Sequence, residues 1–172
     1  MFTGRVGVMM TIHTRDDGHT RSLGAALART LPVSPARSLR VFLKGDLGAG
    51  KTTLVRGLLQ ALGETRTIKS PTYSLLETYD CGPWHVIHLD LYRLAEPRDL
   101  GPLGLADHDH EGALWLIEWP ERGEGALPQP DLEVVLEGAS EGHRLGFAAH
   151  TPLGAAWLQQ ASKESEFSTA ER

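Results

Sequence analysis

At 172 residues the chain is long enough for one domain with its own hydrophobic core, and 41% of its residues are hydrophobic. Its net charge of −5 argues against a surface that neutralises many nucleic-acid phosphates by itself. The single cysteine, Cys81, excludes an internal disulfide, and no apolar run approaches the roughly 18 residues that cross a bilayer. Met1 to Met10 lacks the charged-then-apolar order of a signal peptide, so we expect a cytoplasmic protein without membrane contact.

The first part of the chain predicts a helix, a strand and a second helix. Thr14-Arg-Asp-Asp17 resembles a capping box, and apolar residues at helical spacing continue to about Leu31, where Pro32–Pro35 ends the helix. Leu39–Leu43 is a short apolar run that predicts a buried strand. A glycine-rich loop follows, and then a further set of apolar residues at helical spacing, with Gly63 as the stop signal.

The second part predicts more strands and one last helix. The expected strands are Thr72–Tyr79, Trp84–Tyr92, Ala113–Ile117, Leu132–Leu136 and Arg144–Ala148. Arg98–Leu105 predicts a short helix, and Leu153–Ser162 predicts the last helix. We therefore expect a single domain over residues 1–162. Residues 163–172 form a polar tail without apolar periodicity, which we expect to be disordered.

The strongest motif is the glycine-rich loop from Gly45 to Thr52, which matches the pattern G-x-x-x-x-G-K-[ST]. Its glycines let the backbone curl so that successive N–H groups point inward, and the following helix adds the positive end of its dipole. In this motif Lys51 reaches the β- and γ-phosphates of a nucleotide, and the hydroxyl of Thr52 binds Mg²⁺. Because a predicted strand and an amphipathic helix flank the loop, we interpret it as a nucleotide-binding P-loop.

Two acidic residues at the ends of apolar strands are candidates for the chemistry. Asp90 closes the run that starts at Trp84, and Glu118 closes Ala113–Ile117. Carboxyl ends of strands in open α/β sheets face the ligand crevice. P-loop sites need a carboxylate near Mg²⁺ and a group that orients the attacking water. The alternative interpretation is that each is a solvated acid at a strand end.

Other residues give weaker signals. His88 alternates with Asp90 on one strand face, so it either contacts the site or packs in the core. Trp119 either packs in the core or faces a nucleotide or a partner. Asp107–Glu111 resembles a metal cluster, but contiguous residues cannot all converge on one ion, so a solvated loop is favoured. We expect Cys81 to be inert.

Four motifs in a fixed order resemble one family. They are Gly45-Asp-Leu-Gly-Ala-Gly-Lys-Thr-Thr53, Lys69-Ser-Pro-Thr-Tyr73, His88-Leu-Asp-Leu-Tyr-Arg93 and Ile117-Glu-Trp-Pro120. The P-loop alone is common to many families, whereas the ordered set is similar to TsaE. This family comprises small bacterial ATPases of the pathway that makes threonylcarbamoyladenosine beside the anticodon of certain tRNAs. The resemblance covers about residues 14 to 150.

The resemblance implies a three-layer α/β P-loop NTPase fold, with a central, largely parallel or mixed sheet flanked by helices. It implies weak ATP hydrolysis and a partner, the TsaD–TsaB heterodimer. In the family, TsaE uses ATP to restore that complex between turnovers, and the protein reaches tRNA only through the complex. By motif position, Thr52 and Glu118 resemble the Mg²⁺ ligands, and Asp90 resembles the Walker B acid. Thr72 lies in a segment likened to a GTPase switch, and the family's site also uses Trp119.

The P-loop motif and the resemblance together imply the candidate site residues. The candidate catalytic residues are Asp90, Glu118 and Thr72, and the candidate metal ligands are Thr52, Glu118 and Asp90. The candidate nucleotide-binding residues are Gly45, Asp46, Leu47, Gly48, Ala49, Gly50, Lys51, Thr52, Thr53 and Trp119. The implied cofactors are ATP and Mg²⁺.

Two other functions fit a P-loop. A small-molecule kinase usually carries a lid with arginines, whereas Leu94–Gly112 holds only Arg98 and is acidic overall. A non-enzymatic binding switch would use the nucleotide to fix a surface such as Ser70–Tyr73 for a partner. A GTPase is disfavoured because its guanine-reading N-K-x-D motif needs asparagine, and the chain contains none. We therefore expect adenine to be preferred over guanine.

Overall fold

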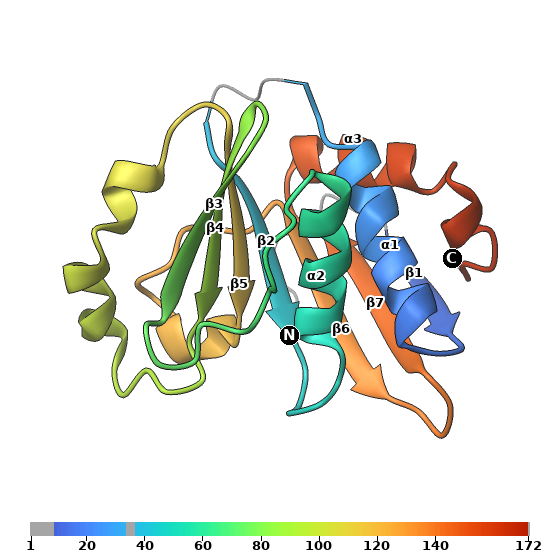
Figure 1. The fold of residues 1–172 in the computed structure, drawn as a ribbon, viewed down its shortest axis with the longest axis horizontal. Coiled ribbons are helices and arrows are strands. Elements are labelled where there is room, and N and C mark those ends of the chain that lie inside the picture. The colour runs from blue at the N-terminus through green and yellow to red at the C-terminus, as the bar shows by residue number, and fades with distance from the viewer. Residues whose placement is uncertain (1–8, 34–36, 172) are drawn as a thin grey trace.

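A seven-stranded mixed sheet forms the centre of the computed structural model, which describes residues 9–33 and 37–171 (Figure 1). The strands lie in the order β1-β7-β6-β2-β5-β4-β3. Their bounds are β1 Met9–Thr14, β2 Leu39–Lys44, β3 Leu76–Cys81, β4 Trp84–Asp90, β5 Ala113–Glu118, β6 Leu132–Gly138 and β7 His143–Ala149. The α-helices are α1 Asp17–Arg29, α2 Lys51–Ala61 and α3 Pro152–Ala161, and the 3₁₀ helices are η1 Pro97–Leu103, η2 Leu105–His108, η3 Pro120–Gly123 and η4 Ser165–Phe167. The expected α/β fold with a mixed central sheet is confirmed.

Four neighbouring strands, β6, β2, β5 and β4, run parallel and therefore end at the same edge of the sheet. Parallel strands are covered on both faces and consist of apolar runs, and every residue of β5 is buried. The pairs β1–β7, β6–β7 and β3–β4 are antiparallel. The register places Glu118 beside Leu43 in β2 and beside Asp90 in β4. Both candidate acids therefore lie close to the strand that enters the glycine-rich loop.

Each face of the sheet has its own core. On one face α1, α2 and α3 cover the sheet, with Leu23 and Trp157 among the buried residues. On the other face Leu100 in η1 packs against β4 and β5 around Ile117. The second covering layer thus consists of 3₁₀ helices and loops rather than α-helices. None of the helices within residues 9–33 and 37–171 has both the length and the apolar character that crossing a membrane requires.

Helices α1 and α2 lie side by side in front of the sheet and approach closely at two glycines (Figure 1). A Cβ atom on Gly24 would lie 2.2 Å from the carbonyl oxygen of Leu54. A Cβ atom on Gly57 would lie 2.0 Å from the carbonyl oxygen of Arg21. Both separations are far below van der Waals contact, so any larger residue would push the helices apart. Helix α1 thereby supports the helix that follows the glycine-rich loop.

The start of α1 differs from the prediction. Thr14 does not cap the helix; it ends β1, a strand that the sequence did not reveal, and its hydroxyl accepts a hydrogen bond from the amide of His143 at 2.9 Å. Asp16 is the N-cap instead and accepts from the amide of His19 at 2.8 Å. Pairing with a distant strand therefore overrides the local capping signal.

Two other elements differ from the prediction. The strand expected from Thr72 begins only at Leu76, because the preceding residues form a turn in which the amide of Leu75 donates to Pro71 at 2.8 Å. The helix expected over Arg98–Leu105 is divided into η1 and η2, since Gly104 between them is left-handed with φ 65°. The predicted turn at Pro32–Pro35 lies partly, and the segment Met1–Met10 mostly, outside the described residues.

The C-terminal tail is docked on the domain through residue 171, so the expected disorder is wrong there. Phe167 is 2% exposed, and its ring centre lies 5.3 Å from that of Phe147. Arg29 pairs with Glu164 at 2.8 Å and with Glu166 at 2.6 Å. Phe167 is the buried aromatic side chain of this segment, and one apolar residue produces no periodic pattern in the sequence.

We expect Phe167→Ala to lower the free energy of unfolding by about 3 kcal/mol, because truncating a buried aromatic side chain leaves a cavity. Thr169→Ala changes an exposed residue of the same segment and should alter stability by less than about 0.5 kcal/mol. Urea unfolding followed by circular dichroism measures both variants. Equal stability of the two would contradict the docking of the tail.

Candidate functional site

The glycine-rich loop joins β2 to α2 at the edge where the parallel strands end. Gly45, Gly48 and Gly50 have φ angles of 145°, 77° and 98°, which other residues rarely adopt. Gly50 is the N-cap of α2 and has no side chain to bond the first amides of the helix. These amides are consequently left for a ligand, as in known anion sites at helix N-termini.

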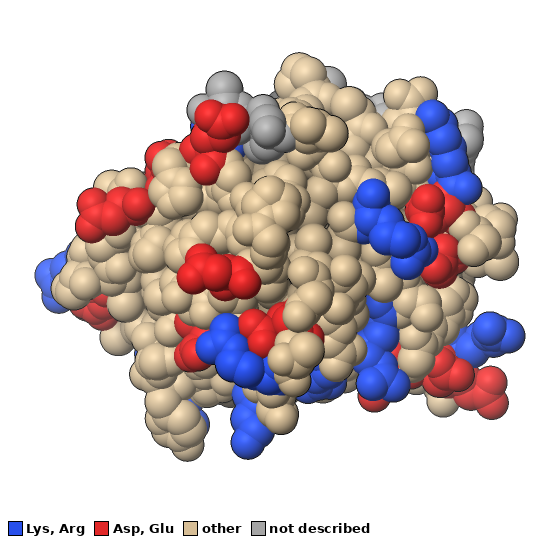
Figure 2. All heavy atoms as spheres, turned by 45° about the horizontal axis from the view of Figure 1, so that its top comes forward, with Lys and Arg blue, Asp and Glu red and all other residues tan. Residues whose placement is uncertain are grey.

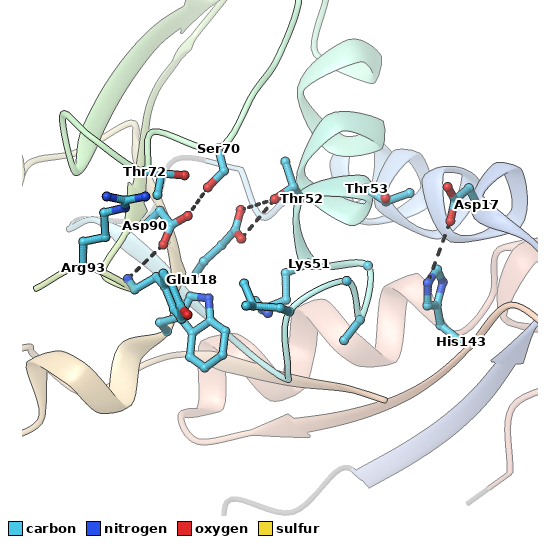
Figure 3. Close-up of a pocket in the computed structure, with 16 residues that line it drawn as sticks. Asp17, Lys51, Thr52, Thr53, Ser70, Thr72, Asp90, Arg93, Glu118 and His143 are labelled. Atoms are coloured by element: carbon cyan, nitrogen blue, oxygen red, sulfur yellow. Dashed lines mark hydrogen bonds and ion pairs between the residues drawn. The ribbon is translucent and has the colours of Figure 1, made fainter. Parts of the chain in front are cut away.

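The loop forms one wall of a cavity of about 530 Å³ (Figure 3). The predicted site residues that line it are Leu47, Gly48, Ala49, Gly50, Lys51, Thr52, Thr53, Thr72, Asp90, Glu118 and Trp119. Gly45 and Asp46 do not line it, but their carbonyl oxygens contact the side chain of Lys51. All four sequence motifs therefore contribute to one cavity, although they are far apart in the chain.

Lys51 lies at the base of this cavity and is 5% exposed. Its Nζ donates to the carbonyl oxygens of Gly45 at 2.5 Å and Asp46 at 2.8 Å. Nζ also lies 4.3 Å from the centre of the Trp119 ring, which is the geometry of a cation–π contact. Burial lowers the pKa of Lys51 from its ordinary value, and the nearby carboxylate of Glu118 opposes this shift.

Glu118 binds the hydroxyl at the start of α2. Its side chain is almost fully buried, and Thr52 Oγ1 lies 2.9 Å from Oε1 and 3.1 Å from Oε2 (Figure 3). On the other side, Nε2 of His88 lies 2.8 Å from Oε1. Glu118 is therefore the carboxylate in direct contact with the hydroxyl of the P-loop motif.

Asp90 lies beside Glu118 but has different partners. Its Oδ2 accepts a short hydrogen bond from the hydroxyl of Ser70, and its Oδ1 accepts from the amide of Tyr92 at 2.9 Å. Ser70 and Thr72 belong to the segment that precedes β3, so Asp90 ties this segment to the cavity wall. The two acids thus face one cavity from neighbouring strands, with Asp90 farther from the loop.

Sequence reasoning did not single out several residues that line the cavity. They are Asp17, Ser70, Tyr92, Arg93 and His143. Three of them lie inside the four quoted motifs and could have been found there, whereas Asp17 appeared only in the expected capping box and His143 in no motif. His143 starts β7, its Nδ1 lies 2.9 Å from Thr20 Oγ1, and its Nε2 lies 3.8 Å from Asp17 Oδ1 (Figure 3). Only the sheet pairing brings it to the loop.

The structure also shows where the residues with weaker sequence signals lie. His88 contacts the site through Glu118. Cys81 is buried, and burial raises the pKa of its thiol, which disfavours the reactive thiolate. In the segment 107–111, Asp109 accepts from Ser38 at 2.6 Å and pairs with Arg40 at 2.9 Å. No group of three or more histidine, cysteine or acidic side chains within the described ranges is arranged to hold a metal ion.

The glycine-rich loop joins a central parallel strand to a helix, and its threonine is hydrogen-bonded to a buried carboxylate. These features define an α/β protein of the P-loop class. The family model described as threonylcarbamoyl adenosine biosynthesis protein TsaE matches residues 14–145. This is well over half of the chain, and the chain belongs to the TsaE family. The resemblance of the four motifs is thereby confirmed.

Individual proteins agree with this assignment. The chain is 42% identical over 124 residues to the tRNA threonylcarbamoyladenosine biosynthesis protein TsaE of Haemophilus influenzae, covering 72% of this chain and 78% of that protein. It is 38% identical over 138 residues to the protein of the same name in Rickettsia conorii, covering 80% and 75%. The crystal structure of YdiB from Bacillus subtilis is similar, with a TM-score of 0.74 and 26% identity, and the match covers 91% of this chain and 95% of that one.

Gly50 lies very close to the ring of His143. A Cβ atom on Gly50 would lie 2.9 Å from Cε1 of His143, whereas one on Gly48 would meet open space. Both glycines have left-handed backbone, so Gly48→Ala is a matched control for strain. We expect Gly50→Ala to lower the free energy of unfolding by about 1 to 3 kcal/mol more than Gly48→Ala, because the added methyl overpacks the contact.

The double variant Gly50→Ala, His143→Ala should show less of this extra loss, because the smaller side chain makes room for the methyl. Urea unfolding of the three variants and the wild type measures the difference. Equal losses for Gly48→Ala and Gly50→Ala would show that His143 does not constrain the loop.

Proposed function

We propose that the chain binds ATP with Mg²⁺ in this cavity and hydrolyses it, in support of the threonylcarbamoyl modification of the adenosine beside the anticodon of tRNA. The observation that carries the proposal is the hydrogen bond from Thr52 to the buried carboxylate of Glu118, beside the ammonium of Lys51. A nucleotide needs cationic and backbone donors for its phosphates, and its metal ion needs oxygen ligands. Both kinds of group meet at the start of α2.

The phosphate groups of ATP fit the glycine-rich loop. The amides from Gly48 to Thr52 would donate to phosphate oxygens, with the positive end of the α2 dipole behind them. Lys51 would exchange the carbonyl oxygens of Gly45 and Asp46 for oxygens of the β- and γ-phosphates. The anion would offset the desolvation of the ammonium. We propose ATP rather than GTP because the N-K-x-D motif needs asparagine, which the chain lacks.

The oxygen donors of the cavity fit Mg²⁺. Thr52 offers a hydroxyl, and Glu118 and Asp90 offer carboxylates, whereas Mg²⁺ prefers oxygen ligands and keeps several waters. Thr52 and Glu118 would hold the ion, and Asp90 would hold its water shell. When bound there, the ion would offset charge on the transferring phosphoryl group. Thr72 would help to orient the attacking water from the opposite wall of the cavity.

We propose the TsaD–TsaB heterodimer as the partner, with ATP hydrolysis restoring that complex between turnovers. The relatives from Haemophilus influenzae and Rickettsia conorii are named for tRNA threonylcarbamoyladenosine biosynthesis. Indirect contact with tRNA is supported by the net charge of −5 and by the mixture of basic and acidic side chains on the face in Figure 2. This role would place the protein in the cytoplasm.

Kinase activity has less support. Arg98, the single arginine of the segment Leu94–Gly112, is highly exposed and pairs with Glu96 at 2.8 Å. It does not line the cavity, so this segment offers no arginine to a transferred phosphoryl group. A non-catalytic switch has one favourable observation, because Tyr73 beside the cavity is 86% exposed and its ring lies 4.5 Å from the guanidinium carbon of Arg93.

Hydrolysis of ATP by the pure chain, alone and with the TsaD–TsaB pair, tests the proposal. We expect slow hydrolysis alone and faster hydrolysis with the pair. Lys51→Ala should abolish ATP–Mg²⁺ binding, since the ligand loses its fixed charge, and should leave the protein folded, since Lys51 lies outside both hydrophobic cores. Lys163→Ala, an exposed residue on the C-terminal side of α3, is the control. Wild-type affinity in Lys51→Ala would overturn the site, and binding without hydrolysis under both conditions would favour the switch.

The two acids should differ when each is replaced. We expect Glu118→Ala to reduce hydrolysis by about 10² to 10⁴, with a much smaller loss of nucleotide affinity. The reason is that Lys51 and the loop amides supply most ground-state binding, whereas a positioned carboxylate acts as charge develops in the transition state. Both variants should also raise the Mg²⁺ concentration required, because Glu118 would hold the ion and Asp90 would hold its water shell.

Turnover measured against Mg²⁺ concentration, with nucleotide affinity alongside, separates these effects. Glu77→Ala, which removes an exposed acid of β3, is the control. Normal hydrolysis by a folded Glu118→Ala variant would show that this residue is only a strand-end acid.

A further inference from the structure

His88 is a fully buried polar residue outside the cavity lining, with 0% exposure. It lies in β4 two residues before Asp90, so both side chains point to the face that α2 covers. The register pairs His88 with Leu116 and Asp90 with Glu118, which places His88 diagonally opposite Glu118 on the neighbouring strand. A long side chain can reach across such a diagonal, and Nε2 of His88 lies 2.8 Å from Oε1 of Glu118.

The proton in this contact can be assigned from the partner. An ionised carboxylate only accepts hydrogen bonds, so Nε2 of His88 carries the proton and donates. The other ring nitrogen, Nδ1, is buried and has no hydrogen-bond partner among the described residues. The ring therefore directs its one satisfied nitrogen at Glu118. Burying a ring nitrogen without a hydrogen-bond partner costs free energy, so the bond from Nε2 to Glu118 offsets only part of the cost of burying His88.

The hydroxyl of Thr52 alone does not supply enough hydrogen-bond donors for the Glu118 carboxylate. Its carboxylate is 2% exposed and carries a charge that must be matched by donors. The hydroxyl of Thr52 has one proton, which rotates and is shared between two oxygens at 2.9 and 3.1 Å. The ring of His88 is rigid and fully packed, so its donor has a fixed direction.

We propose that His88 is a positioning residue, which holds the Glu118 carboxylate in the orientation that binds the Thr52 hydroxyl before any nucleotide enters. The donor occupies Oε1 on the side away from the loop and keeps the carboxylate turned toward the start of α2. Loss of the donor would leave Glu118 with one rotating hydroxyl and several orientations. The proposal rests on the proposed function, because its consequence is the Mg²⁺ requirement of ATP binding and hydrolysis.

Two substitutions of His88 separate donation from packing. His88→Leu fills most of the space but removes the donor, whereas His88→Gln keeps an N–H that can reach Glu118. Hydrogen bonds to charged groups are strong enough that losing one changes an equilibrium about 10- to 100-fold. We expect His88→Leu to raise the Mg²⁺ concentration for half-maximal hydrolysis by about that factor, and His88→Gln to remain within a few fold of the wild type.

His85→Leu is the matched control on the same strand. His85 bonds Asp80 at 2.7 Å, away from the cavity, and should leave the Mg²⁺ dependence unchanged. Equal Mg²⁺ dependence in the wild type and His88→Leu would overturn the proposal. Equal impairment of His88→Gln and His88→Leu, with matching losses of melting temperature, would also overturn it, because packing alone would then explain both.

A second measurement needs neither nucleotide nor metal. In protein labelled with ¹⁵N-histidine, we expect the His88 resonances to show a proton on Nε2, with a shift that changes in Glu118→Ala and stays nearly constant in Glu77→Ala. An unprotonated Nε2, or a His88 chemical shift that is the same in Glu118→Ala as in the wild type, would overturn the positioning role. If the wild type fails to bind ATP–Mg²⁺ while this signature is present, the proposed function fails and the His88–Glu118 contact stands.

Discussion

A carboxylate buried as deeply as that of Glu118 must find donors inside the protein, because its charge has lost the solvation of water. Its donors come from two directions, Thr52 at the start of α2 and His88 in β4. Both can reach it only if β5 lies between β2 and β4 and all three strands end together, as the parallel register requires. Satisfying one charge thus fixes the positions of the loop, the helix and two strands relative to one another.

Lys51 is a second buried charge of the cavity, with the opposite sign to Glu118. Its ammonium is held by two carbonyl oxygens and an aromatic face, and no carboxylate within residues 9–33 and 37–171 pairs with it directly. The positive and negative groups therefore lie near each other without being bonded to each other. Each is held by neutral or polar neighbours in a defined place, so an anion and a cation entering together would meet prearranged partners. This separation of charges suits the site to a ligand that carries both signs.

The loop and the central strands were predictable because their signals are local. The spacing of Gly45, Gly50 and Lys51 specifies the loop, and unbroken apolar runs specify strands that are buried on both faces. The apolar strands also indicated Asp90 and Glu118 at their ends, but only the resemblance to the family, and not the strand pattern, distinguished their roles. Only the strand order, with β5 next to β2, gives Glu118 the contact with the threonine of the loop.

Features that depend on distant partners were not predictable in the same way. Strand β1 alternates weakly and is specified by its pairing with β7, and His143 reaches the loop through that same pairing. Phe167 docks through one aromatic contact, which has no period. The 3₁₀ helices replace a predicted helix because Gly104 turns the chain between them. For β1, His143 and Phe167 a contact between remote segments outweighs local preference, whereas Gly104 acts locally.

The docked tail has a consequence for how copies of the molecule behave toward one another. Strand β1 is the last strand at one side of the sheet, and an uncovered edge strand offers free amides and carbonyls to a strand of another molecule. Here Thr11 in β1 exchanges two backbone hydrogen bonds of 2.8 Å with Glu171. Glu171 thereby occupies one pairing position of β1 that would otherwise be open, which disfavours edge-to-edge pairing with another molecule at that position.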